Sequence, residues 1–392
     1  MAFSSAIREA KVRKRPTKAQ LLRIAPVPVT RPCTPPLEDL LPYLQDIWAS
    51  SQLTNNAVNV RRLQEELQEY LGVSHVNLVA NGTLGLLLAL RALGISGEVI
   101  TTPYTFVATT NAIVLAGATP VFADIDPETL NLSPEAVEAR VTDQTQAILA
   151  VHSYGIPCDV EALQTIADRH GIPIIYDAAH CFGVEVGGRS LLDYGTCSIL
   201  SFHATKVFNT FEGGAVVSSN PQLNQAIGQL ANNGIVDEVN VNSVGLNAKM
   251  SELHAAIGLA QLPYVSGQIA QRLAIVEAYL EGLSDVQGLS FVQAKPDVIH
   301  NGYMFPIILG ADYPVERDAL YEILTKNGIS ARRYFYPIVA DLPTYKRSSA
   351  IDFEEFVVAR RAAEGVLCLP LFPGLDASIQ DRIIEIVRNP LC

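Results

Sequence analysis

The stretch IPIIYDAAHCFG, residues 172–183, joins a short apolar run to a turn-like sequence that contains one acidic residue. The β-branched and aromatic residues of the run predict a buried strand, and Asp177 lies at its carboxyl end. Removing a carboxylate from water costs free energy unless a cation is placed to pair with it. Asp177 is therefore either the partner of a cation in a site or the N-cap of a helix that the DAAH sequence could begin.

Comparable strands are predicted on both sides of this one. Between about residues 72 and 218, short β-branched runs alternate with segments of helical period, which predicts the α/β class with a mostly parallel sheet covered by helices. The expected strands are EVITT (98–102), PVFADI (120–125), AILAVH (147–152), PIIYDA (173–178), SILSFH (198–203) and AVVSS (215–219). The expected helices include 84–93, 105–116 and 159–170. In such folds the chemistry lies at the carboxyl ends of the strands.

The C-terminal third has a different pattern. A helical region covers roughly 249–284, and QLPY at 261–264 should kink it or end its first part. The strands LSFVQ (289–293) and MFPIIL (304–309) and the helices 315–327 and 377–388 then predict a smaller α+β domain. We expect an N-terminal extension over residues 1–25, a large domain over 26–270 and a small C-terminal domain over 271–392.

Composition excludes several classes of partner. The chain has 392 residues, of which 49% are hydrophobic and 17% charged, as in a soluble globular protein with a large core. A net charge of −12 argues against a nucleic-acid or anionic-membrane surface, so an anionic ligand would need a local pocket. The basic segment over residues 1–20 lacks the apolar stretch of a secretory signal, and the most apolar window, 76–96, is too interrupted to span a membrane.

Cysteine spacing indicates neither a metal site nor a disulfide framework, because no C-x-x-C pair occurs. The six cysteines are at positions 33, 158, 181, 197, 368 and 392. Reduced thiols in a cytoplasmic protein are the expected state.

Lysine usage points to one residue in SFHATKVFNTFEGG, residues 201–214. No lysine occurs between Lys18 and Lys206, although that interval contains several arginines. Arginine stays charged, whereas a lysine in a desolvated pocket can lose its proton and attack a carbonyl. Lys206 is thus a candidate nucleophile, and an exposed surface charge is the alternative.

Two further segments follow predicted strands. In NLVANGTLGLLLAL, residues 77–90, a helix opens directly after Asn81-Gly82-Thr83, and free N–H groups with a threonine hydroxyl there would form a phosphate cup. An ordinary turn with an N-cap is the alternative. In TTPYTFVATTNAI, residues 101–113, an aromatic side chain could stack on a cofactor ring or belong to the core.

A phosphate cup, an aromatic residue, an aspartate and a lysine in this order resemble fold-type I pyridoxal-phosphate enzymes, and closely the DegT/DnrJ/StrS family of sugar aminotransferases. The resemblance covers nearly the whole chain after residue 25. It is carried by RPCTPPLEDLLPYLQDIWASSQLTNN (31–56), GATPVFADIDPETLNLS (117–133), VHSYGIPCDVEAL (151–163), YDAAHCFG (176–183), SFHATKVFNTFEGGAVV (201–217) and GLNAKMSELHAAIGLAQL (245–262).

The resemblance implies a role for each matching position. Lys206 would hold pyridoxal 5'-phosphate as an internal aldimine, and Asp177 would pair with the pyridinium nitrogen. Phe106 would lie against the ring, while His180 stands where many members have glutamine near the cofactor's hydroxyl. The remaining cofactor contacts would come from Gly82, Thr83 with the Leu84 backbone, Ser201 and Asn247.

The resemblance also implies a homodimer with shared active sites, because Asn247 matches an asparagine that reaches the phosphate in the neighbouring subunit. Many members have an arginine-asparagine-histidine-glycine run where this chain has ANNGIVDE, residues 231–238, so a basic contribution is missing here. Lys249, Arg332 and Arg333 are candidates for meeting a nucleotide diphosphate, and Tyr334 lies in the same aromatic and basic stretch.

The implied reaction is a ping-pong transamination with pyridoxamine phosphate as intermediate. The expected donor is L-glutamate, and the expected acceptor is dTDP-4-keto-6-deoxyglucose, giving dTDP-4-amino-4,6-dideoxyglucose for deoxyamino-sugar or O-antigen biosynthesis. Amination at C3 of a dTDP-3-keto-6-deoxyhexose is the alternative. A sugar dehydratase of the same fold, in which histidine holds the lysine position, and a non-catalytic regulator are two others.

Overall fold

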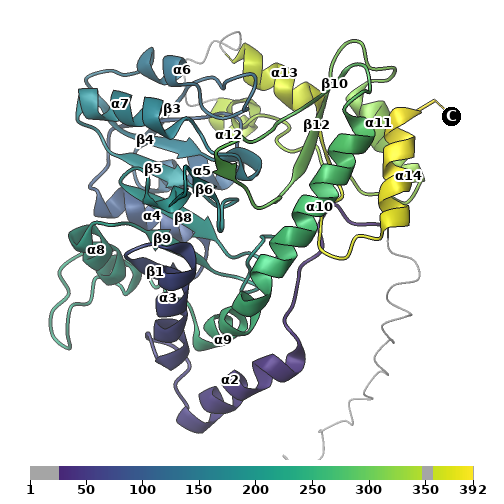
Figure 1. The fold of residues 1–392 in the computed structure, drawn as a ribbon. Helices are drawn as coiled ribbons and strands as arrows, with labels where there is room; N and C mark the ends of the chain where they lie inside the picture. The colour runs from purple at the N-terminus through teal and green to yellow at the C-terminus, as the bar shows by residue number, and fades with distance from the viewer. Residues whose placement is uncertain (1–25, 347–355, 392) are drawn as a thin grey trace, which may run out of the picture.

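The computed structural model describes residues 26–346 and 356–391 (Figure 1). The expected extension over residues 1–25 lies outside the described residues, as does Cys392.

A seven-stranded sheet forms the centre of the larger part of the molecule, with the strand order β1-β9-β8-β5-β4-β2-β3. The strands are β1 (Val76–Val79), β2 (Glu98–Thr101), β3 (Thr119–Phe122), β4 (Thr145–Val151), β5 (Ile174–Asp177), β8 (Cys197–Ser201) and β9 (Gly214–Val217). All of them run parallel except β9, which pairs antiparallel with both of its neighbours. The predicted α/β class is confirmed, and each of the six predicted strands has its counterpart here.

Alternate strand residues face two separate helix layers, as the period of a β-strand requires. Ile148 and Ala150 of β4 belong to one buried cluster, and Ala147 and Leu149 belong to another. The first cluster includes residues of α3 (Val58–Leu71), α7 (Val160–His170) and α9 (Glu252–Gln261); the second includes residues of α4 (Gly82–Ala92), α5 (Val107–Leu115) and α8 (Pro221–Ala231). With both faces covered, the carboxyl ends of the strands are left as the place for a site.

A second, smaller sheet lies beside the C-terminal part of the long helix α10 (Val265–Leu283), as Figure 1 shows. The chain enters α10 from α9 through a 3-10 turn at Leu262–Tyr264, where QLPY predicted a kink. The small sheet has the antiparallel order β10-β12-β13, built from β10 (Leu289–Phe291), β12 (Phe305–Leu309) and β13 (Val366–Leu369), and packs with α11 (Arg317–Lys326) and α14 (Ala377–Arg388). Residue 270, the predicted domain boundary, falls inside α10, and the domain division stays a prediction.

The remaining α-helices and strands of the described residues complete the fold. They are α2 (Leu37–Ser50), α6 (Pro134–Glu138), α12 (Pro343–Lys346), α13 (Val357–Gly365) and a three-stranded sheet of β11 (Val298–Ile299), β6 (Glu185–Val186) and β7 (Arg189–Ser190). Ser133 caps α6 by accepting a hydrogen bond from the Ala136 N–H, as predicted. The β11–β6 pairing connects the segment after residue 285 with the turn region after β5.

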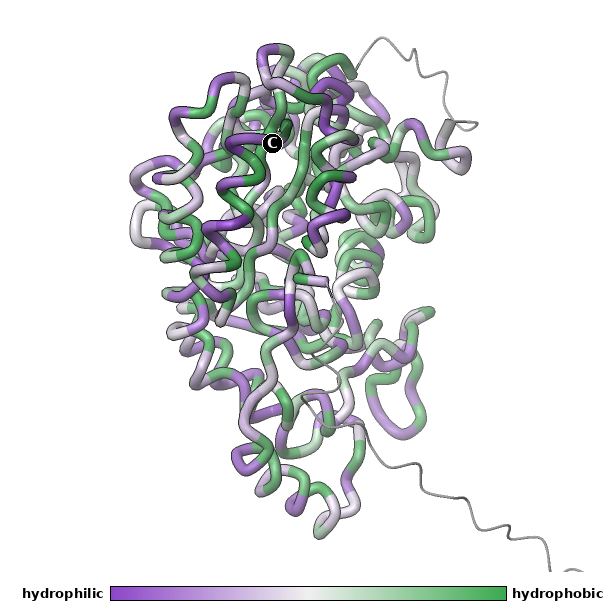
Figure 2. Tube along the Cα trace, turned by 90° about the vertical axis from the view of Figure 1, so that its right-hand side faces the viewer, coloured by the Kyte–Doolittle hydropathy of each residue, from purple (hydrophilic) through white to green (hydrophobic). Residues whose placement is uncertain are grey.

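Hydrophobic and hydrophilic stretches alternate along much of the chain, as the tube in Figure 2 shows. Within residues 26–346 and 356–391, no helix has both the length and the apolar character needed to cross a membrane.

Candidate active site

A cavity of about 610 Å³ lies at the carboxyl ends of the central strands. Ten of the predicted site residues line it: Gly82, Thr83, Leu84, Phe106, Asp177, His180, Ser201, Lys206, Arg332 and Tyr334. A larger hollow of about 920 Å³ surrounds Arg317 and Arg361 but contains none of these ten. The smaller cavity is the candidate active site because acid, amine and phosphate-cup groups converge there.

Asp177 ends β5 with its carboxylate buried, at 7% exposure. Its Oδ2 accepts a hydrogen bond from the Thr109 hydroxyl at 2.8 Å, and its Oδ1 accepts one from the Ala179 N–H at 3.2 Å. Burial raises the pKa of this carboxyl, while those two hydrogen bonds and the charge of Lys206 oppose the rise. A turn, not a helix, follows β5, so the helix-cap alternative is wrong. The carboxylate is left in need of a further cation.

Lys206 presents its amine to the same cavity. Its Nζ lies 3.2 Å from the Tyr303 hydroxyl and 4.8 Å from the centroid of that ring. Burial lowers the pKa of Lys206, and Arg332 acts in the same direction, while Tyr334 and Asp177 oppose them. An amine with a lowered pKa is a better nucleophile and proton carrier near neutral pH. The place of Lys206 in the cavity lining argues against the surface-charge alternative.

The phosphate cup is the first turn of α4. Asn81 caps this helix by accepting a hydrogen bond from the Leu84 N–H at 2.9 Å. Because a helix leaves its first N–H groups without intrahelical partners, Gly82 and Thr83 can present theirs to an anion, while that of Leu84 is already bonded. Ser201 lies close by, since a Cβ on Gly82 would come within 3.2 Å of the Ser201 Cβ.

Gly214 explains how β9 passes so close to this turn. A Cβ at position 214 would lie 2.7 Å from the backbone nitrogen of Gly82 and from the carbonyl carbon of Asn81. Any other residue would therefore push the phosphate cup away from β9.

Phe106 immediately precedes α5 and is 51% exposed at the cavity edge, so it is not a core aromatic. Its ring centroid lies 6.4 Å from that of Tyr334. The structure therefore supports an aromatic that can lie against a ligand at this edge, although the predicted helix over 105–116 begins two residues later, at Val107.

His180 is buried and held by two contacts. Its Nδ1 accepts a hydrogen bond from the Tyr154 N–H at 3.1 Å, and its ring stacks on that of Tyr303 with the centroids 4.4 Å apart. Burial lowers the pKa of His180 well below its usual range, and the charge of Lys206 acts in the same direction. The ring is thus neutral with its proton on Nε2, which makes it a hydrogen-bond donor as a glutamine amide would be.

Replacing His180 by glutamine should therefore leave kcat within about threefold of wild type, because a neutral donor remains. His180→Phe keeps a ring for stacking but removes the donor, and we expect about a tenfold loss, the upper range for one neutral hydrogen bond. Steady-state kinetics of both variants would test this. A phenylalanine variant as fast as wild type would show that the donor has no role.

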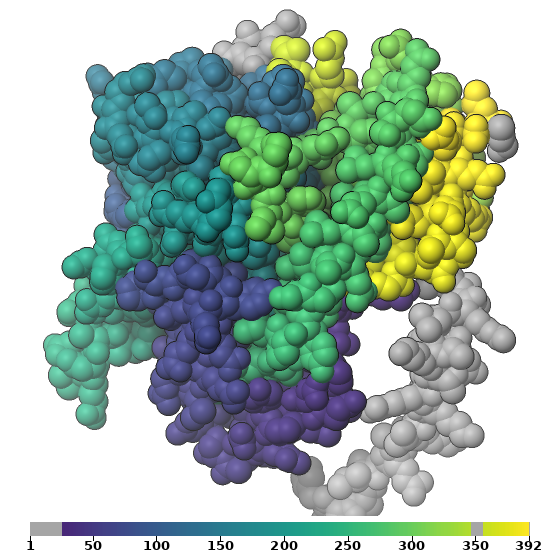
Figure 3. Space-filling view, in the orientation of Figure 1, coloured from purple at the N-terminus to yellow at the C-terminus, as the bar shows by residue number. Residues whose placement is uncertain are grey.

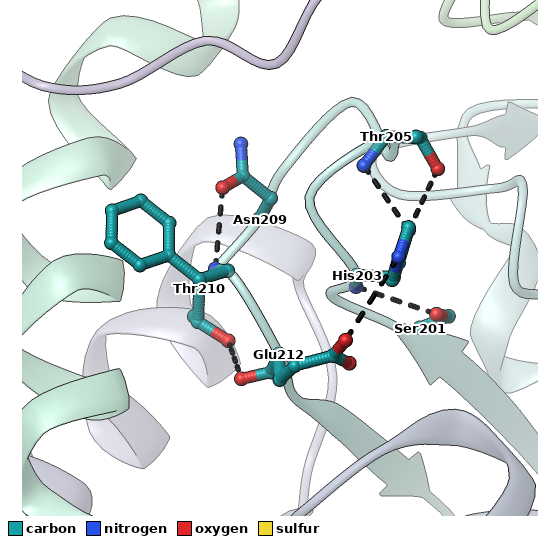
Figure 4. A network of polar contacts seen from close by, with 7 residues as sticks. Ser201, His203, Thr205, Asn209, Thr210 and Glu212 are labelled. Carbon is teal, nitrogen blue, oxygen red and sulfur yellow. Dashed lines mark hydrogen bonds and ion pairs between the residues drawn. The ribbon is translucent and has the colours of Figure 1, made fainter.

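Sequence reasoning missed five polar residues of the cavity: Thr30, Tyr303, His203, Thr205 and Glu212. In Figure 4 the last three lie on the loop between β8 and β9, where His203 Nδ1 lies 2.9 Å from the Thr205 hydroxyl and His203 Nε2 lies 3.9 Å from Glu212 Oε1. These three are within the motif that contains Lys206 and could have been found from it. Tyr303 has no such local signal.

Three predicted residues lie outside the lining of this cavity. Arg333 pairs with Asp318 at 3.0 Å and lies over the Tyr321 ring. Asn247 is exposed, and its Oδ1 accepts a hydrogen bond from Lys249 Nζ at 2.9 Å. Lys249 borders a separate hollow of about 290 Å³.

The residues present fit pyridoxal phosphate. The buried Asp177 carboxyl has a raised pKa, the first turn of α4 offers N–H donors for a phosphate, and Lys206 supplies an amine in the same cavity. These are the features that this cofactor requires of a protein.

Comparison with known proteins supports the same conclusion. Residues 37–388 match the model of the DegT/DnrJ/EryC1/StrS aminotransferase family. The dTDP-4-amino-4,6-dideoxy-D-glucose transaminases of Shigella dysenteriae and Escherichia coli are 45% and 41% identical to the chain, each over 93% of it and 99% of the relative. The GDP-perosamine synthase of Vibrio cholerae is 35% identical over 88% of the chain and 95% of its own length.

Solved structures agree with these relatives. A structure of DesI with its TDP-sugar product has a TM-score of 0.88 and 35% identity over 93% of both chains. NtdA from Bacillus subtilis, with bound cofactor PMP, has a TM-score of 0.81 and 28% identity over 89% of this chain and 80% of its own. Together with the cavity geometry, these matches show that the chain belongs to the DegT/DnrJ/EryC1/StrS aminotransferase family and is a pyridoxal-phosphate-dependent aminotransferase.

Proposed function

We propose that the enzyme transfers the amino group of L-glutamate to dTDP-4-keto-6-deoxyglucose and so forms dTDP-4-amino-4,6-dideoxyglucose. The observation that carries this proposal is the 41–45% identity, over 93% of the chain, to two relatives named as transaminases of that amino sugar. The likeness to DesI, solved with a TDP-sugar product, also supports a thymidine-linked sugar.

When bound, pyridoxal phosphate takes up the amino group of the donor, withdraws electrons from the reacting carbon and passes the amino group to the acceptor. Gly82, Thr83 and Ser201 would hold its phosphate, and Asp177 would keep its ring nitrogen protonated. Lys206 Nζ would move one proton between the donor's α-carbon and the cofactor's C4' carbon, and would reverse that transfer for the sugar. His180 would donate a hydrogen bond from its Nε2–H to the hydroxyl oxygen of the cofactor ring.

The proposal includes a homodimer in which Asn247 of the partner subunit completes the phosphate site. In support, Asn247 is exposed, and the neighbouring segment carries the exposed apolar residues Ile235, Val236, Val239, Val241 and Val244. This segment projects from the body below α8 in Figures 1 and 3. Lys249 binds Asn247 through Oδ1, which leaves the amide N–H₂ as the donor for an anion.

Arg332 and Tyr334 line the cavity and are the residues that we assign to the nucleotide sugar. The Arg332 guanidinium carbon lies 4.5 Å from the centroid of the Tyr334 ring. Both follow residue 271, so under the proposed domain division the small domain closes one side of the cavity. The proposal also places the enzyme in the cytoplasm, and the five described cysteines, which are free, are in keeping with a reducing compartment.

The regiochemistry of the sugar can be tested directly. With glutamate as donor, dTDP-4-keto-6-deoxyglucose should be aminated at C4, and NMR of the product identifies the carbon. The matched dTDP-3-keto sugar should react far more slowly, because hydrogen-bond contacts that fit one orientation of the sugar leave groups unpaired in the other. Product at C3 only would favour the C3 aminotransferase, and product at neither carbon would contradict the sugar assignment while leaving the cofactor assignment intact.

A further inference from the structure

The amine of Lys206 already has a partner in the cavity. Tyr303 is 4% exposed, and its hydroxyl lies 3.2 Å from Lys206 Nζ, while its ring lies beneath the same amine at 4.8 Å. Two kinds of attraction, a hydrogen bond and a cation–π contact, therefore hold the lysine at one place.

Tyr303 is itself fixed by the buried side chain of Asn301. The Asn301 Oδ1 accepts a hydrogen bond from the Tyr303 N–H at 3.0 Å, and its Nδ2 donates to the carbonyls of His180 and Phe182 at 2.8 and 3.0 Å. Both carbonyls belong to the turn that follows Asp177. The segment that leads into β12 is thus tied to the turn beside Asp177, and this tie positions the Tyr303 hydroxyl in the cavity.

Two glycines make this tie possible. Gly155 lies so close to Asn301 that a Cβ at position 155 would be 2.9 Å from Asn301 Oδ1. Gly302, between Asn301 and Tyr303, has a φ of +59°. A side chain at either position would displace Asn301 or strain the backbone.

We propose that Tyr303 is the positioning residue that receives the Lys206 amine whenever this amine is not bonded to the cofactor. The inference rests on the proposed transamination, in which Lys206 is released in the first half-reaction, bonds to the cofactor again at the end of the second, and must move a proton in both while it is free. A free lysine side chain has many rotamers, and restricting it to one place lowers the entropic part of the barrier.

A hydroxyl suits this task better than a carboxylate would. It can accept a hydrogen bond from a charged or a neutral amine and can donate one to a neutral amine, so contact persists as the proton comes and goes. Burial raises the pKa of Tyr303, which keeps the hydroxyl neutral. A carboxylate at the same place would instead raise the pKa of the Lys206 amine, so that the ammonium form would give up its proton less readily.

The test is Tyr303→Phe, which removes one oxygen atom and keeps the ring. Tyr279→Phe is the matched control, because Tyr279 is buried like Tyr303 but lies in the core of the small sheet. Its hydroxyl donates a hydrogen bond to the Pro370 carbonyl. Single-turnover rates would be followed for each half-reaction separately, by the absorbance of the bound cofactor. Unfolding midpoints of both variants would be measured beside them.

We expect Tyr303→Phe to slow both half-reactions by about tenfold, with the KM for glutamate within about twofold of wild type and normal rates in Tyr279→Phe. The apoenzyme of Tyr303→Phe should also react with pyridoxal phosphate more slowly, because its free amine is less well placed. This uptake needs neither substrate, so it tests Tyr303 even if the sugar assignment or the transamination itself is wrong. Uptake and half-reactions at wild-type rates, or an equal loss in Tyr279→Phe, would overturn the inference.

Discussion

Replacing Lys206 by alanine is expected to lower transamination by at least about 10⁴-fold, the upper range for losing a general acid–base group. Both half-reactions need the same amine, so both should fail together. Lys206→Arg should fail as completely, because a guanidinium keeps its charge and cannot attack a carbonyl.

A chemical measurement separates this loss from a folding defect. Borohydride treatment of the loaded wild type should attach the cofactor irreversibly to Lys206, as a mass increase on the peptide that contains it, and neither variant should acquire that mass. Lys326→Ala is the control, since Lys326 is an exposed lysine of α11 paired only at the surface, with Glu322 at 3.7 Å. Attachment at another lysine, or substantial turnover by Lys206→Ala, would contradict the assignment.

The central sheet could be predicted because its information is local. Each strand is a short β-branched run between turn signals, and the cavity residues at strand ends, such as Asp177 at the end of β5, lie in or directly after their strand in the chain. The family resemblance then added roles to positions that periodicity alone left open, Phe106 and Ser201 among them. Both line the cavity, as expected.

Contacts between distant segments could not be predicted in the same way. Tyr303 reaches Lys206 from 97 positions further along the chain, and the placement depends on Asn301 bonding to the turn after β5. Arg332 and Arg333 are neighbours in sequence, yet Arg332 lines the cavity and Arg333 pairs with Asp318. Neighbouring residues in extended backbone point to opposite sides, so only the three-dimensional path of this segment distinguishes them.

Replacing Asp177 by asparagine is expected to separate activity from stability. Because burial raises the pKa of the folded carboxyl above its unfolded value, ionising Asp177 destabilises the apoenzyme as pH rises through the folded pKa. Asparagine is nearly the same size and carries no charge, so the apoenzyme of Asp177→Asn should be as stable as wild type in acid and more stable near neutral pH. The free energy of unfolding against pH, measured without cofactor, tests this sign.

With pyridoxal phosphate bound, aspartate rather than asparagine should be the favoured residue at position 177. Asparagine cannot keep a ring nitrogen protonated, so kcat should fall by about 10²-fold or more, the usual cost of losing a charge-stabilising group at a reacting centre. The rise in unfolding free energy that wild type gains from saturating pyridoxal phosphate should also shrink. Asp168→Asn, an exposed aspartate of α7 bonded to Gln164, should change neither quantity. If Asp177→Asn were less stable than wild type as apoenzyme at neutral pH, the carboxylate would be a structural anchor rather than a charge held ready for the cofactor.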